Sequence, residues 1–598
     1  MTKLKKSLLL LPLLIALNAF CAMAQAPRLF FTDLDSGPNA GGENVNGFAG
    51  AYVTLYGNFF GSSQGSSTVT WNGLNCLRVL PATGSYTGWG MAHFWYQEII
   101  VQLGSGCTPG TGNFVVTVNG QASNGIPFTV RSGHIYFVST TGSDSNVGTA
   151  SSPWRTITHC RDSISAGDTC YIENGVSQTT TDNYDAALCI YNGGTAGNPM
   201  AIVAYPGASV SIGNSTNSYG LRVPEIGISP GYWTFAKINF GPNGEAMNPF
   251  QANNWRIVGN KFQCPNANGQ SGCYETNESS YNKFFGNEVT NVSTSLGFVA
   301  NKQQHGVYWS SDSNHIEAAW NYIHDNMDCR AIQVHSSPLG GGGSGDPTGH
   351  NQYDISIHDN FIYGDPCDGI DLATVDPSQG KVELYNNVIA HTGMGPSPQG
   401  GDSGDYSGIY FAYITNNGPV GGGTIEVYNN TLYDTGSYVG FGGENGAFMI
   451  NGGESSLLVR LRNNLVLQLS NEPYVNGAGA NSTYVSGSNN IWFGGSGSAP
   501  TFTTGNITTN PLLTNPSLHN FLSFELQSGS PAIDAGVAIS SSNTYKNYPP
   551  WQGGTPLDQT GITRPQGSAF DIGAYEYYKG GSTAQKPNPP TSLSAVAH

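Results

Sequence analysis

Charged residues are scarce in this chain of 598 residues, and positive ones are the scarcest. Lys, Arg, Asp and Glu together make up 10% of the sequence, whereas about a quarter is usual in soluble proteins. Only 22 residues are Lys or Arg against 39 Asp or Glu, which gives a formal net charge of −17. Binding to nucleic acid needs a basic surface that neutralises phosphates. The sequence therefore predicts no nucleic-acid partner.

Long hydrophobic runs are absent beyond residue 24, so we expect no membrane span. The chain begins MTKLKKSLLLLPLLIALNAFCAMA, in which Lys residues precede the apolar run Leu8–Leu17 and a small-residue end, Ala22-Met23-Ala24. This pattern is typical of a secretory signal peptide, and its apolar run is too short for a membrane anchor. We predict a secreted or cell-surface protein whose signal peptide spans residues 1–24.

The C-x-x-C spacing of many zinc and redox sites is also missing. Ten Cys occur, and nine remain without Cys21 of the signal peptide, in an exported chain that can keep disulfides. Proximity in the sequence predicts four pairs: Cys76–Cys107, Cys160–Cys170, Cys264–Cys273 and Cys329–Cys367. Cys189 is left over, and a pairing of Cys170 with Cys189 stays open as the alternative.

Gly is abundant instead, with 81 residues, and it falls in turns without the period of collagen. Between the turns, short alternating runs such as Val382-Glu383-Leu384-Tyr385 leave no room for regular helices. One Asn recurs in each repeat, in steps of 27, 34, 39, 27, 43 and 34 residues: Asn260, Asn287, Asn321, Asn360, Asn387, Asn430 and Asn464. Such self-similarity is typical of a solenoid whose insertions lie in loops on one side.

The coherent interpretation is a parallel β-helix with three short strands in each coil. A Gly-hydrophobic run recurs and aligns on successive coils, at residues 306–309, 331–334, 369–372 and 408–411. We expect the recurrent Asn to adopt left-handed backbone geometry at a turn and to hydrogen-bond the Asn above and below. The same register places Cys329 and Cys367 on adjacent coils, within the reach of a disulfide.

Residues 27–131 form a separate first unit, in which short strands alternate with Gly and Asn turns at the spacing of a β-sandwich. The segments 53–61 (VTLYGNFFG) and 114–120 (FVVTVNG) resemble the immunoglobulin-like IPT/TIG family. The resemblance implies a spacer or interaction module without a catalytic site. Five residues form a candidate aromatic patch, for which we favour core packing over ligand contact: Trp89, His93, Phe94, Trp95 and Tyr96.

The second unit, residues 134–577, opens with IYFVSTTGSDSNVGTASSPWRTI (135–157) and resembles secreted right-handed parallel β-helix proteins, a group that includes pectate lyases. Residues 156–165 are expected to form a short helix that caps the open end of the solenoid. Residues 167–175 are expected to be its first strand. The predicted fold class is all-β, a right-handed parallel β-helix preceded by a small immunoglobulin-like β-sandwich.

The end of the chain has two parts. SPAIDAG (530–536) and DIGAYEY (571–577) resemble the closing segment of the same β-helix group. Residues 578–598 are rich in Gly, Pro and Ser and are expected to form a flexible tail.

The candidate site lies on the Gly-hydrophobic strands, which the resemblance to pectate-lyase-like helices implies to be the catalytic face. The longest Gly-rich insertions, residues 336–352, 392–407 and 412–423, flank these strands, and long loops on a rigid scaffold build clefts. Because side chains alternate along a strand, one set points inward: Val307, Trp309, Ile332, Val334, Ile370, Leu372, Ile409 and Phe411. The outward set stacks on successive coils: Tyr308, Gln333, Asp371 and Tyr410.

Charged residues gather at the starts of the same strands. They are His305, Asp328, Arg330, Asp368 and Asp405, and His335 continues the outward face of its own strand. Singly, each has a structural explanation, such as a salt bridge between Arg330 and Asp368 on adjacent coils. Together, beside the longest loops of a chain with few charges, they indicate a functional cleft.

Two reactions fit this set. The resemblance to pectate-lyase-like enzymes implies elimination from an acidic polysaccharide, with Arg330 as the base. Asp328, Asp368 and Asp371 would then hold Ca²⁺, which prefers carboxylate oxygens. We favour this reaction narrowly, because one Arg lies among three Asp.

Hydrolysis by two carboxyl groups is the alternative. Asp368 and Asp371 are three strand residues apart, about 10 Å between Cα atoms, which allows the carboxyl separation of about 6.5–9.5 Å in inverting hydrolases. DGID (368–371) resembles part of the polygalacturonase motif, but that family's other motifs are missing, so its triad is not carried over.

The remaining site residues serve either reaction. His305 and His335 are alternative proton-transfer groups, since imidazole titrates near neutrality. Tyr308, Gln333, Tyr410 and Asp405 are expected to bind the sugar. We expect an extracellular polysaccharide as partner, no organic cofactor and a monomeric protein.

A third hypothesis is a non-catalytic surface adhesin or carbohydrate-binding solenoid. Such a protein should show no perturbed carboxyl groups and no deep groove beside residues 328–371.

Overall fold

The structure is a computed structural model that describes most of the chain from residue 25 to residue 578. The described residues are 25–81, 88–224, 227–242, 244–269, 271–336, 351–399, 405–412, 423–439, 443–451, 457–516, 520–539 and 556–578. The predicted signal peptide, the tail after residue 578 and the central parts of the three Gly-rich insertions lie outside them. No helix in the described part is long and apolar enough to cross a membrane.

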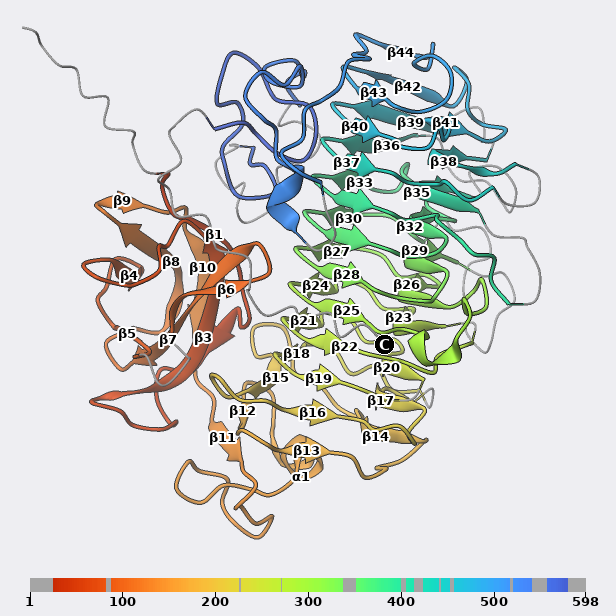
Figure 1. Cartoon of the computed structure of the whole chain (residues 1–598). Coiled ribbons are helices and arrows are strands. Elements are labelled where there is room, and N and C mark those ends of the chain that lie inside the picture. The colour runs from red at the N-terminus through yellow and green to blue at the C-terminus, as the bar shows by residue number, and fades with distance from the viewer. Residues whose placement is uncertain are drawn as a thin grey trace, which may run out of the picture.

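The first unit is a sandwich of two five-stranded sheets, drawn red to orange in Figure 1. Its strands are β1 (Arg28–Thr32), β2 (Ser36–Gly37), β3 (Phe48–Asn58), β4 (Thr68–Trp71), β5 (Leu77–Val79), β6 (Trp89–His93), β7 (Tyr96–Gly104), β8 (Gly110–Val118), β9 (Gln121–Ala122) and β10 (Ile126–Val130). One sheet has the order β1-β3-β7-β5 with β6 on β7, and the other β2-β10-β8-β4 with β9 on β8. The predicted small β-sandwich is confirmed, while its IPT/TIG membership stays a prediction.

The second unit winds upward in Figure 1 from yellow to blue, and successive coils contribute strands to three parallel sheets. Sheet 1 has thirteen strands and precedes the Asn turn of each coil, sheet 2 has eleven and follows it, and sheet 3 has ten and holds the Gly-hydrophobic strands. The predicted right-handed parallel β-helix is confirmed, and with it the order of strands within a coil.

The strand bounds fall into these three sheets. Sheet 1 contains β11 (Ile135–Val138), β12 (Thr169–Ile172), β15 (Met200–Ala204), β18 (Trp233–Ala236), β21 (Arg256–Val258), β24 (Lys283–Phe285), β27 (Ile316–Ala319), β30 (Ile355–His358), β33 (Val382–Tyr385), β36 (Gly423–Tyr428), β39 (Leu457–Arg462), β42 (Val485–Ser488) and β44 (Thr503–Thr504). Sheet 2 contains β13 (Ser177–Gln178), β16 (Ser211–Ile212), β19 (Asn239–Phe240), β22 (Lys261–Phe262), β25 (Glu288–Thr290), β28 (Tyr322–His324), β31 (Phe361–Tyr363), β34 (Val388–Ala390), β37 (Thr431–Tyr433), β40 (Leu465–Leu467) and β43 (Ile491–Phe493). Sheet 3 contains β14 (Ala186–Cys189), β17 (Tyr219–Arg222), β20 (Glu245–Asn248), β23 (Gly272–Asn277), β26 (His305–Ser310), β29 (Arg330–His335), β32 (Asp368–Leu372), β35 (Tyr406–Phe411), β38 (Asn445–Ile450) and β41 (Val475–Asn476).

The lower end of the solenoid is covered as predicted. The helix α1 (Ile157–Ser163) begins after the N-cap Thr156, whose side chain accepts a hydrogen bond from the N–H of His159. Its residues Ile157 and Cys160 are buried in the coil interior. The first strand lies earlier than predicted, because Ile135–Val138 already pairs in parallel with Thr169–Ile172. Two short 3-10 helices, Thr294–Leu296 and Phe521–Phe524, complete the elements.

The recurrent Asn residues form one continuous ladder. Asn321 Oδ1 accepts hydrogen bonds from Asn287, from its backbone N at 2.9 Å and from its Nδ2 at 3.2 Å, and Asn321 Nδ2 donates to Asn360 Oδ1 at 2.9 Å. The ladder covers all seven predicted positions and continues to Asn490. Since each amide is buried and bonded on both sides, the ladder joins the coils along one edge.

The left-handed geometry lies one residue earlier than predicted. Asn386, Asn429 and Asn463 have φ of 51°, 53° and 53°, and each precedes a ladder residue. The described ladder positions themselves have no positive φ. The preceding residue therefore makes the sharp corner, and the ladder Asn directs its side chain along the stack of coils.

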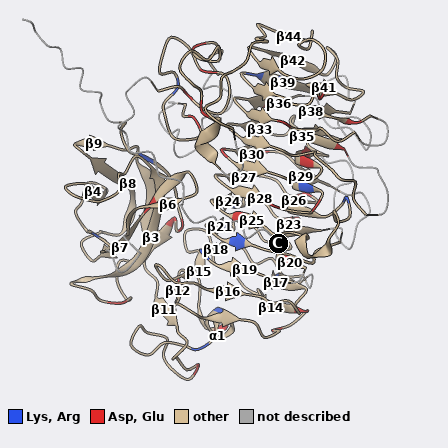
Figure 2. Ribbon diagram, in the orientation of Figure 1, with Lys and Arg blue, Asp and Glu red and all other residues tan. Residues whose placement is uncertain are grey.

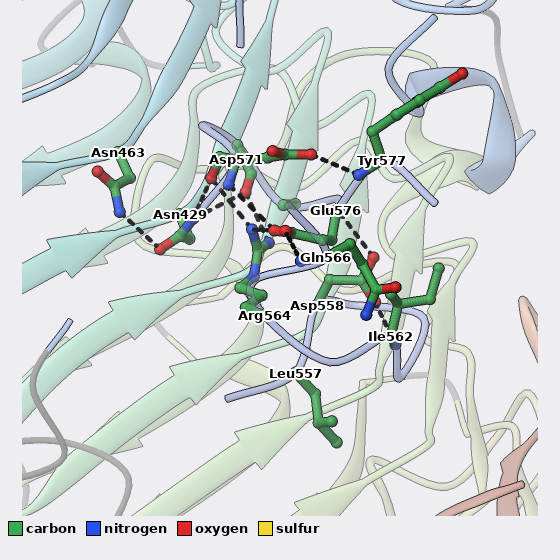
Figure 3. A network of polar contacts seen from close by, with 12 residues as sticks. Asn429, Asn463, Leu557, Asp558, Ile562, Arg564, Gln566, Asp571, Glu576 and Tyr577 are labelled. Atoms are coloured by element: carbon green, nitrogen blue, oxygen red, sulfur yellow. Dashed lines mark hydrogen bonds and ion pairs between the residues drawn. The ribbon is translucent and has the colours of Figure 1, made fainter. Parts of the chain in front are cut away.

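A second row of Asn side chains holds the C-terminal segment, residues 556–578. Asn386 Nδ2 donates to the carbonyl of Leu557 at 3.0 Å, and Asn429 Nδ2 to that of Asp571 at 3.0 Å. In Figure 1 the blue end of the chain accordingly folds back against the edge of the upper coils, and Figure 3 shows Asn429 beside Asp571. The sequence signal for this row is a pair of consecutive Asn at four successive turns of the later coils, 386–387, 429–430, 463–464 and 489–490, which the prediction of one Asn per coil did not use.

Arg564 is the centre of the C-terminal segment (Figure 3). Its side chain is 0% exposed, and Nη1 lies 3.0 Å from Glu576 Oε2. Nη1 also donates to the carbonyl of Asp571 at 3.2 Å, and Nη2 to that of Gly573 at 2.9 Å. Asn429 donates to the same two carbonyls, so this ion pair fixes the segment on the solenoid.

The aromatic patch of the sandwich packs against the β-helix. Tyr96 OH donates to the carbonyl of Trp320 at 3.0 Å, and Trp95 Nε1 to that of Gln559 at 3.2 Å. His93 Nε2 lies 2.9 Å from the carbonyl of Gly286. The predicted burial is therefore correct, but these residues serve the joint between the two units.

All four predicted disulfides are present, and Cys189 is buried and free. Cys329–Cys367 has a Cα–Cα distance of 4.8 Å and joins the starts of β29 and β32. The alternative pairing of Cys170 with Cys189 is not formed. The disulfides bear out the coil register on which the candidate site was built.

The Asn ladder predicts a clear stability effect. Asn321→Ala is expected to lower the free energy of unfolding by about 1–3 kcal/mol for each buried partner left unpaired, among them the Asn287 N–H and the Phe284 carbonyl. Urea unfolding followed by circular dichroism measures the change. Asn192→Ala, at an exposed Asn outside the ladder, is the matched control. Equal midpoints for the two variants would contradict a stabilising ladder.

Candidate functional site

A groove of about 450 Å³ runs along the outer face of sheet 3. Its lining residues come from seven consecutive strands, β17, β20, β23, β26, β29, β32 and β35, and from the turns beside them. At about 4.8 Å between neighbouring strands, these coils span about 29 Å. The groove therefore lies on the predicted strands but extends further toward the N-terminal coils than the sequence indicated.

The strand register agrees with the sequence alignment. Tyr308, Gln333, Asp371 and Tyr410 are paired on successive coils, and all four line the groove. The eight residues predicted to point inward are all buried in the core of the solenoid. The alternation of faces was therefore predicted correctly for β26, β29, β32 and β35.

Arg330 organises the charged centre of the groove. Its Nε lies 3.0 Å from Asp371 Oδ2 and 3.4 Å from Asp368 Oδ2, and its Nη1 donates to the carbonyl of Lys302 at 2.7 Å. Burial alone would lower the pKa of Arg330, but Asp371, Asp368 and Asp405 together raise it above its ordinary value. Arg330 is thus held as a cation, which opposes its predicted role as a base.

Asp371 is the buried carboxyl group that faces the groove. Gln333 Nε2 donates to its Oδ2 at 2.6 Å, the same oxygen that pairs with Arg330. Its Oδ1 is buried and has no hydrogen-bond partner among the described residues. Burial raises the pKa of Asp371 to about 6, against the lowering effects of Arg330 and Gln333. A carboxyl group with this pKa can hold and release a proton near neutrality.

Asp368 lies beneath the groove, although it shares Arg330 with Asp371. Its Oδ1 accepts a hydrogen bond from Ser407 Oγ at 2.7 Å, its side chain is 0% exposed, and it is not among the lining residues. Burial raises the pKa of Asp368 well above its usual range, although Arg330 lowers it. Asp368 and Asp371 therefore both pair with the Arg330 guanidinium, which occupies the space between the two carboxyl groups. This arrangement opposes their predicted role as the two carboxyl groups on either side of a glycosidic bond.

Asp405 is the second carboxyl group that lines the groove near Arg330. It forms a hydrogen bond with Glu444, and this bond, followed by burial, raises the pKa of Glu444 to about 7. Glu444 can therefore hold a proton near neutral pH and donate it to Asp405. Sequence reasoning missed Glu444, which stands alone in a Gly-rich segment without a recurring neighbour.

His305, Tyr308 and His335 form a polar wall of the groove. Tyr308 stacks on the His305 ring at 4.5 Å between centroids, and its OH lies 3.2 Å from His335 Nδ1. His305 Nδ1 lies 3.1 Å from the carbonyl of Ser271, so this nitrogen carries the ring proton. Burial, followed by Arg330, lowers the pKa of His305 well below its usual range and that of His335 to about 4. Both imidazoles are therefore neutral at neutral pH.

The predicted calcium ligands are divided between two places. Asp328 lies against Asp365, away from the groove lining, and burial followed by this neighbour raises the pKa of Asp328 well above its usual range. Asp368 and Asp371 are bonded to Arg330 instead. The described residues contain no group of three or more His, Cys, Asp or Glu arranged to hold a metal ion. These three Asp do not fit a shared ion, and calcium stays a prediction without an assigned site.

The N-terminal part of the groove contains residues that sequence reasoning missed. Glu245 and Glu275 come from adjacent strands β20 and β23, and burial, followed by Glu275, raises the pKa of Glu245 to about 8. Arg222 lies over the Tyr219 ring at 4.3 Å. The alignment began at residue 306 and did not include these early coils, although residues 220–223 (GLRV) have the same Gly-hydrophobic pattern.

No family model and no curated protein matches this sequence. Among solved structures, pectate lyase Pel9A is similar with a TM-score of 0.45 and 17% identity, over 75% of this chain and 97% of that one. The Family 28 exopolygalacturonase of Yersinia enterocolitica has a TM-score of 0.38 and 11% identity, over 82% and 100%. PfbA, a surface adhesin of Streptococcus pneumoniae, has a TM-score of 0.28 and 9% identity, over 58% and 73%. The function is therefore argued from the groove itself.

Proposed function

We propose that this protein cleaves glycosidic bonds of an extracellular polysaccharide in the groove of sheet 3, with Asp371 as the proton-transferring group. The observation that carries the proposal is the buried Oδ1 of Asp371, which has no partner among the described residues and belongs to a side chain lining the groove. An acceptor without a partner, in a side chain that lines a groove of 450 Å³, favours a polar ligand that supplies the missing hydrogen bond.

Hydrolysis is the reaction that these groups support best. In its protonated form, Asp371 donates its proton to the glycosidic oxygen as the bond to the anomeric carbon breaks. Asp405 accepts a proton from the water that attacks the anomeric carbon, so the water oxygen ends on the sugar. A water placed between two carboxyl groups gives an inverting hydrolase. Arg330 and Gln333 orient Asp371, and Tyr308 and Tyr410 line the groove beside it.

Elimination has weaker support from the same residues. It needs a base that is unprotonated at the working pH, whereas the three carboxyl groups around Arg330 outweigh burial and raise its pKa. It also needs a group that neutralises the sugar carboxylate, and Arg330 is already bonded to Asp368 and Asp371. A carboxyl group that lines a groove and has its pKa raised to about 6 favours catalysis over a non-catalytic adhesin.

A screen of polysaccharides tests the reaction class. The purified full chain is incubated with each polymer, and both reducing ends and the ultraviolet absorbance of unsaturated products are recorded. New reducing ends without unsaturated product, unchanged by a calcium chelator, are expected for hydrolysis. Unsaturated product that the chelator abolishes would replace hydrolysis with calcium-assisted elimination, and a polymer that binds without being cut would favour the adhesin.

A further inference from the structure

We infer that the substrate of this groove is an uncharged polysaccharide, without the uronic-acid or sulfate groups of acidic polymers. The inference rests on the proposed glycan cleavage and adds the chemical class of the polymer. It follows from the charges that line the groove, from their bonding partners, and from the sequence of the segments that adjoin the groove strands along the chain.

The groove offers no excess of positive charge. Five carboxyl groups line it against three Lys or Arg: Glu245, Glu275, Glu278, Asp371 and Asp405 against Arg222, Lys302 and Arg330. The two His that line it are neutral near pH 7, because their pKa values lie below the usual range. If Glu245 and Asp371 are both protonated, three carboxylates still balance three cations. An anionic polymer would therefore add unbalanced negative charge at every coil.

Arg330, the cation beside Asp371, already forms ion pairs within the protein. Arg330 directs Nε at Asp371 and Asp368 and Nη1 at the carbonyl of Lys302. A sugar carboxylate would have to approach a guanidinium whose charge is already matched by Asp368 and Asp371, both 0% exposed. Arg222 lies on β17, five strands away from Asp371 along sheet 3. Lys302 remains as a single ammonium group without an ion pair in the described part of the chain.

The sequence that adjoins the groove strands contains no further Lys or Arg. Residues 337–350 and 413–422 follow β29 and β35 in the chain, residues 400–404 precede β35, and none of these segments contains Lys or Arg. They contain Asp346 and Asp402 instead. Figure 2 shows how sparse the blue residues are along the whole β-helix. The chain as a whole carries a net charge of −17, which repels an anionic polymer at long range as well.

An uncharged sugar fits the same lining. Its hydroxyl groups can donate to Asp371 Oδ1 and Asp405 and accept from Lys302, and its ring faces can pack on Tyr308 and Tyr410. None of these contacts requires an existing ion pair to break. The groove can therefore hydrogen-bond the hydroxyl groups of an uncharged sugar, and no cation is needed to balance the ligand.

Matched polymer pairs test the inference. The full chain is assayed on pairs that share a backbone and differ in charge, such as fully methyl-esterified homogalacturonan against polygalacturonate, and neutral xylan against glucuronoxylan. Each assay is run with and without added Ca²⁺. We expect kcat/KM for the uncharged member to exceed that for the charged one by about tenfold or more, because like charges meet in the groove.

A charge-reversal variant links the preference to the groove. Glu278 lines the groove and is only partly buried, so Glu278→Lys should reduce the preference for the uncharged member by about threefold or more. Glu173→Lys makes the same change in net charge outside the groove and should leave the preference unchanged. Faster cleavage of the charged members by the unmodified chain, with or without Ca²⁺, would overturn the inference while leaving glycan cleavage intact. Absence of cleavage on every member would overturn the proposed function itself.

Discussion

Asp371→Asn is expected to leave the fold intact and to reduce kcat by about a hundredfold or more, because it removes the group that transfers the proton. The substitution is nearly isosteric, and an Asn carbonyl can still accept the hydrogen bond from Gln333 that Asp371 Oδ2 accepts at 2.6 Å. Arg330 keeps Asp368 as a partner, so no guanidinium is left buried without a counter-charge. Initial rates on a polymer that the unmodified chain cuts, together with circular dichroism of both proteins, measure the two expectations.

The matched control is Asp354→Asn. Asp354 pairs with His315 at 3.0 Å beside sheet 1, outside the groove, and its left-handed φ of 51° suits Asn. This variant should keep the rate of the unmodified protein within a few-fold. Activity of Asp371→Asn at the same level would place the proton-transferring group elsewhere in the groove.

The pH profile follows from the pKa of Asp371, which burial raises to about 6. As a general acid, Asp371 must be protonated before the bond breaks, so kcat/KM should be highest below pH 6 and fall by about tenfold per unit above it. Because the pKa of the folded state is raised, protonated Asp371 also contributes stability at low pH, and this contribution is lost as the pH rises through about 6. A profile that rises through pH 6 and stays high would assign Asp371 to the base role.

The sequence predicted most of the solenoid because each coil must bury the same inward face and close the same turn. An inward side chain at every second position and one Asn per turn must recur whenever three strands close a coil, so Asn260 to Asn464 could be aligned without a structure. The same alternation placed Asp371 and Gln333 correctly on the outer face. Alternation was not applied to Asp328 and Asp368, because it does not fix the direction of a side chain at the entrance of a strand. Asp328 precedes β29, and Asp368 is the first residue of β32.

Contacts between distant segments were beyond the sequence for a different reason. The C-terminal segment binds the first Asn of consecutive pairs such as Asn386-Asn387, and no periodicity links residue 564 to residue 386. The N-terminal coils of the groove were missed because Glu245 and Glu275 lie on strands that lack the recurrent run. A sequence repeat thus predicts the strand register that neighbouring coils have in common. The positions of the C-terminal segment and of the irregular coils depend on contacts that occur only once, so no repeat predicts them.

Arg564→Met is expected to lower the free energy of unfolding by about 3–5 kcal/mol, because it leaves Glu576 as a buried charge without its partner. The guanidinium is 0% exposed and also satisfies the carbonyls of Asp571 and Gly573, which the Met side chain cannot do. Denaturant midpoints report the loss, and limited proteolysis should cut the C-terminal segment first.

Arg460→Met provides the contrast for Arg564, since it removes an Arg–Glu pair of similar length, 2.8 Å to Glu426, at a side chain that is 34% exposed. An exposed pair contributes about 0–1 kcal/mol, because water and salt screen it. The two variants therefore separate burial from ion pairing as the source of the effect. Combining Arg564→Met with Glu576→Gln removes both buried charges and should recover part of the loss, since an unpaired charge costs more than an absent pair. Equal stability losses for Arg564→Met and Arg460→Met would show that the C-terminal segment is held by its backbone contacts to Asn386 and Asn429, and that the buried ion pair adds nothing.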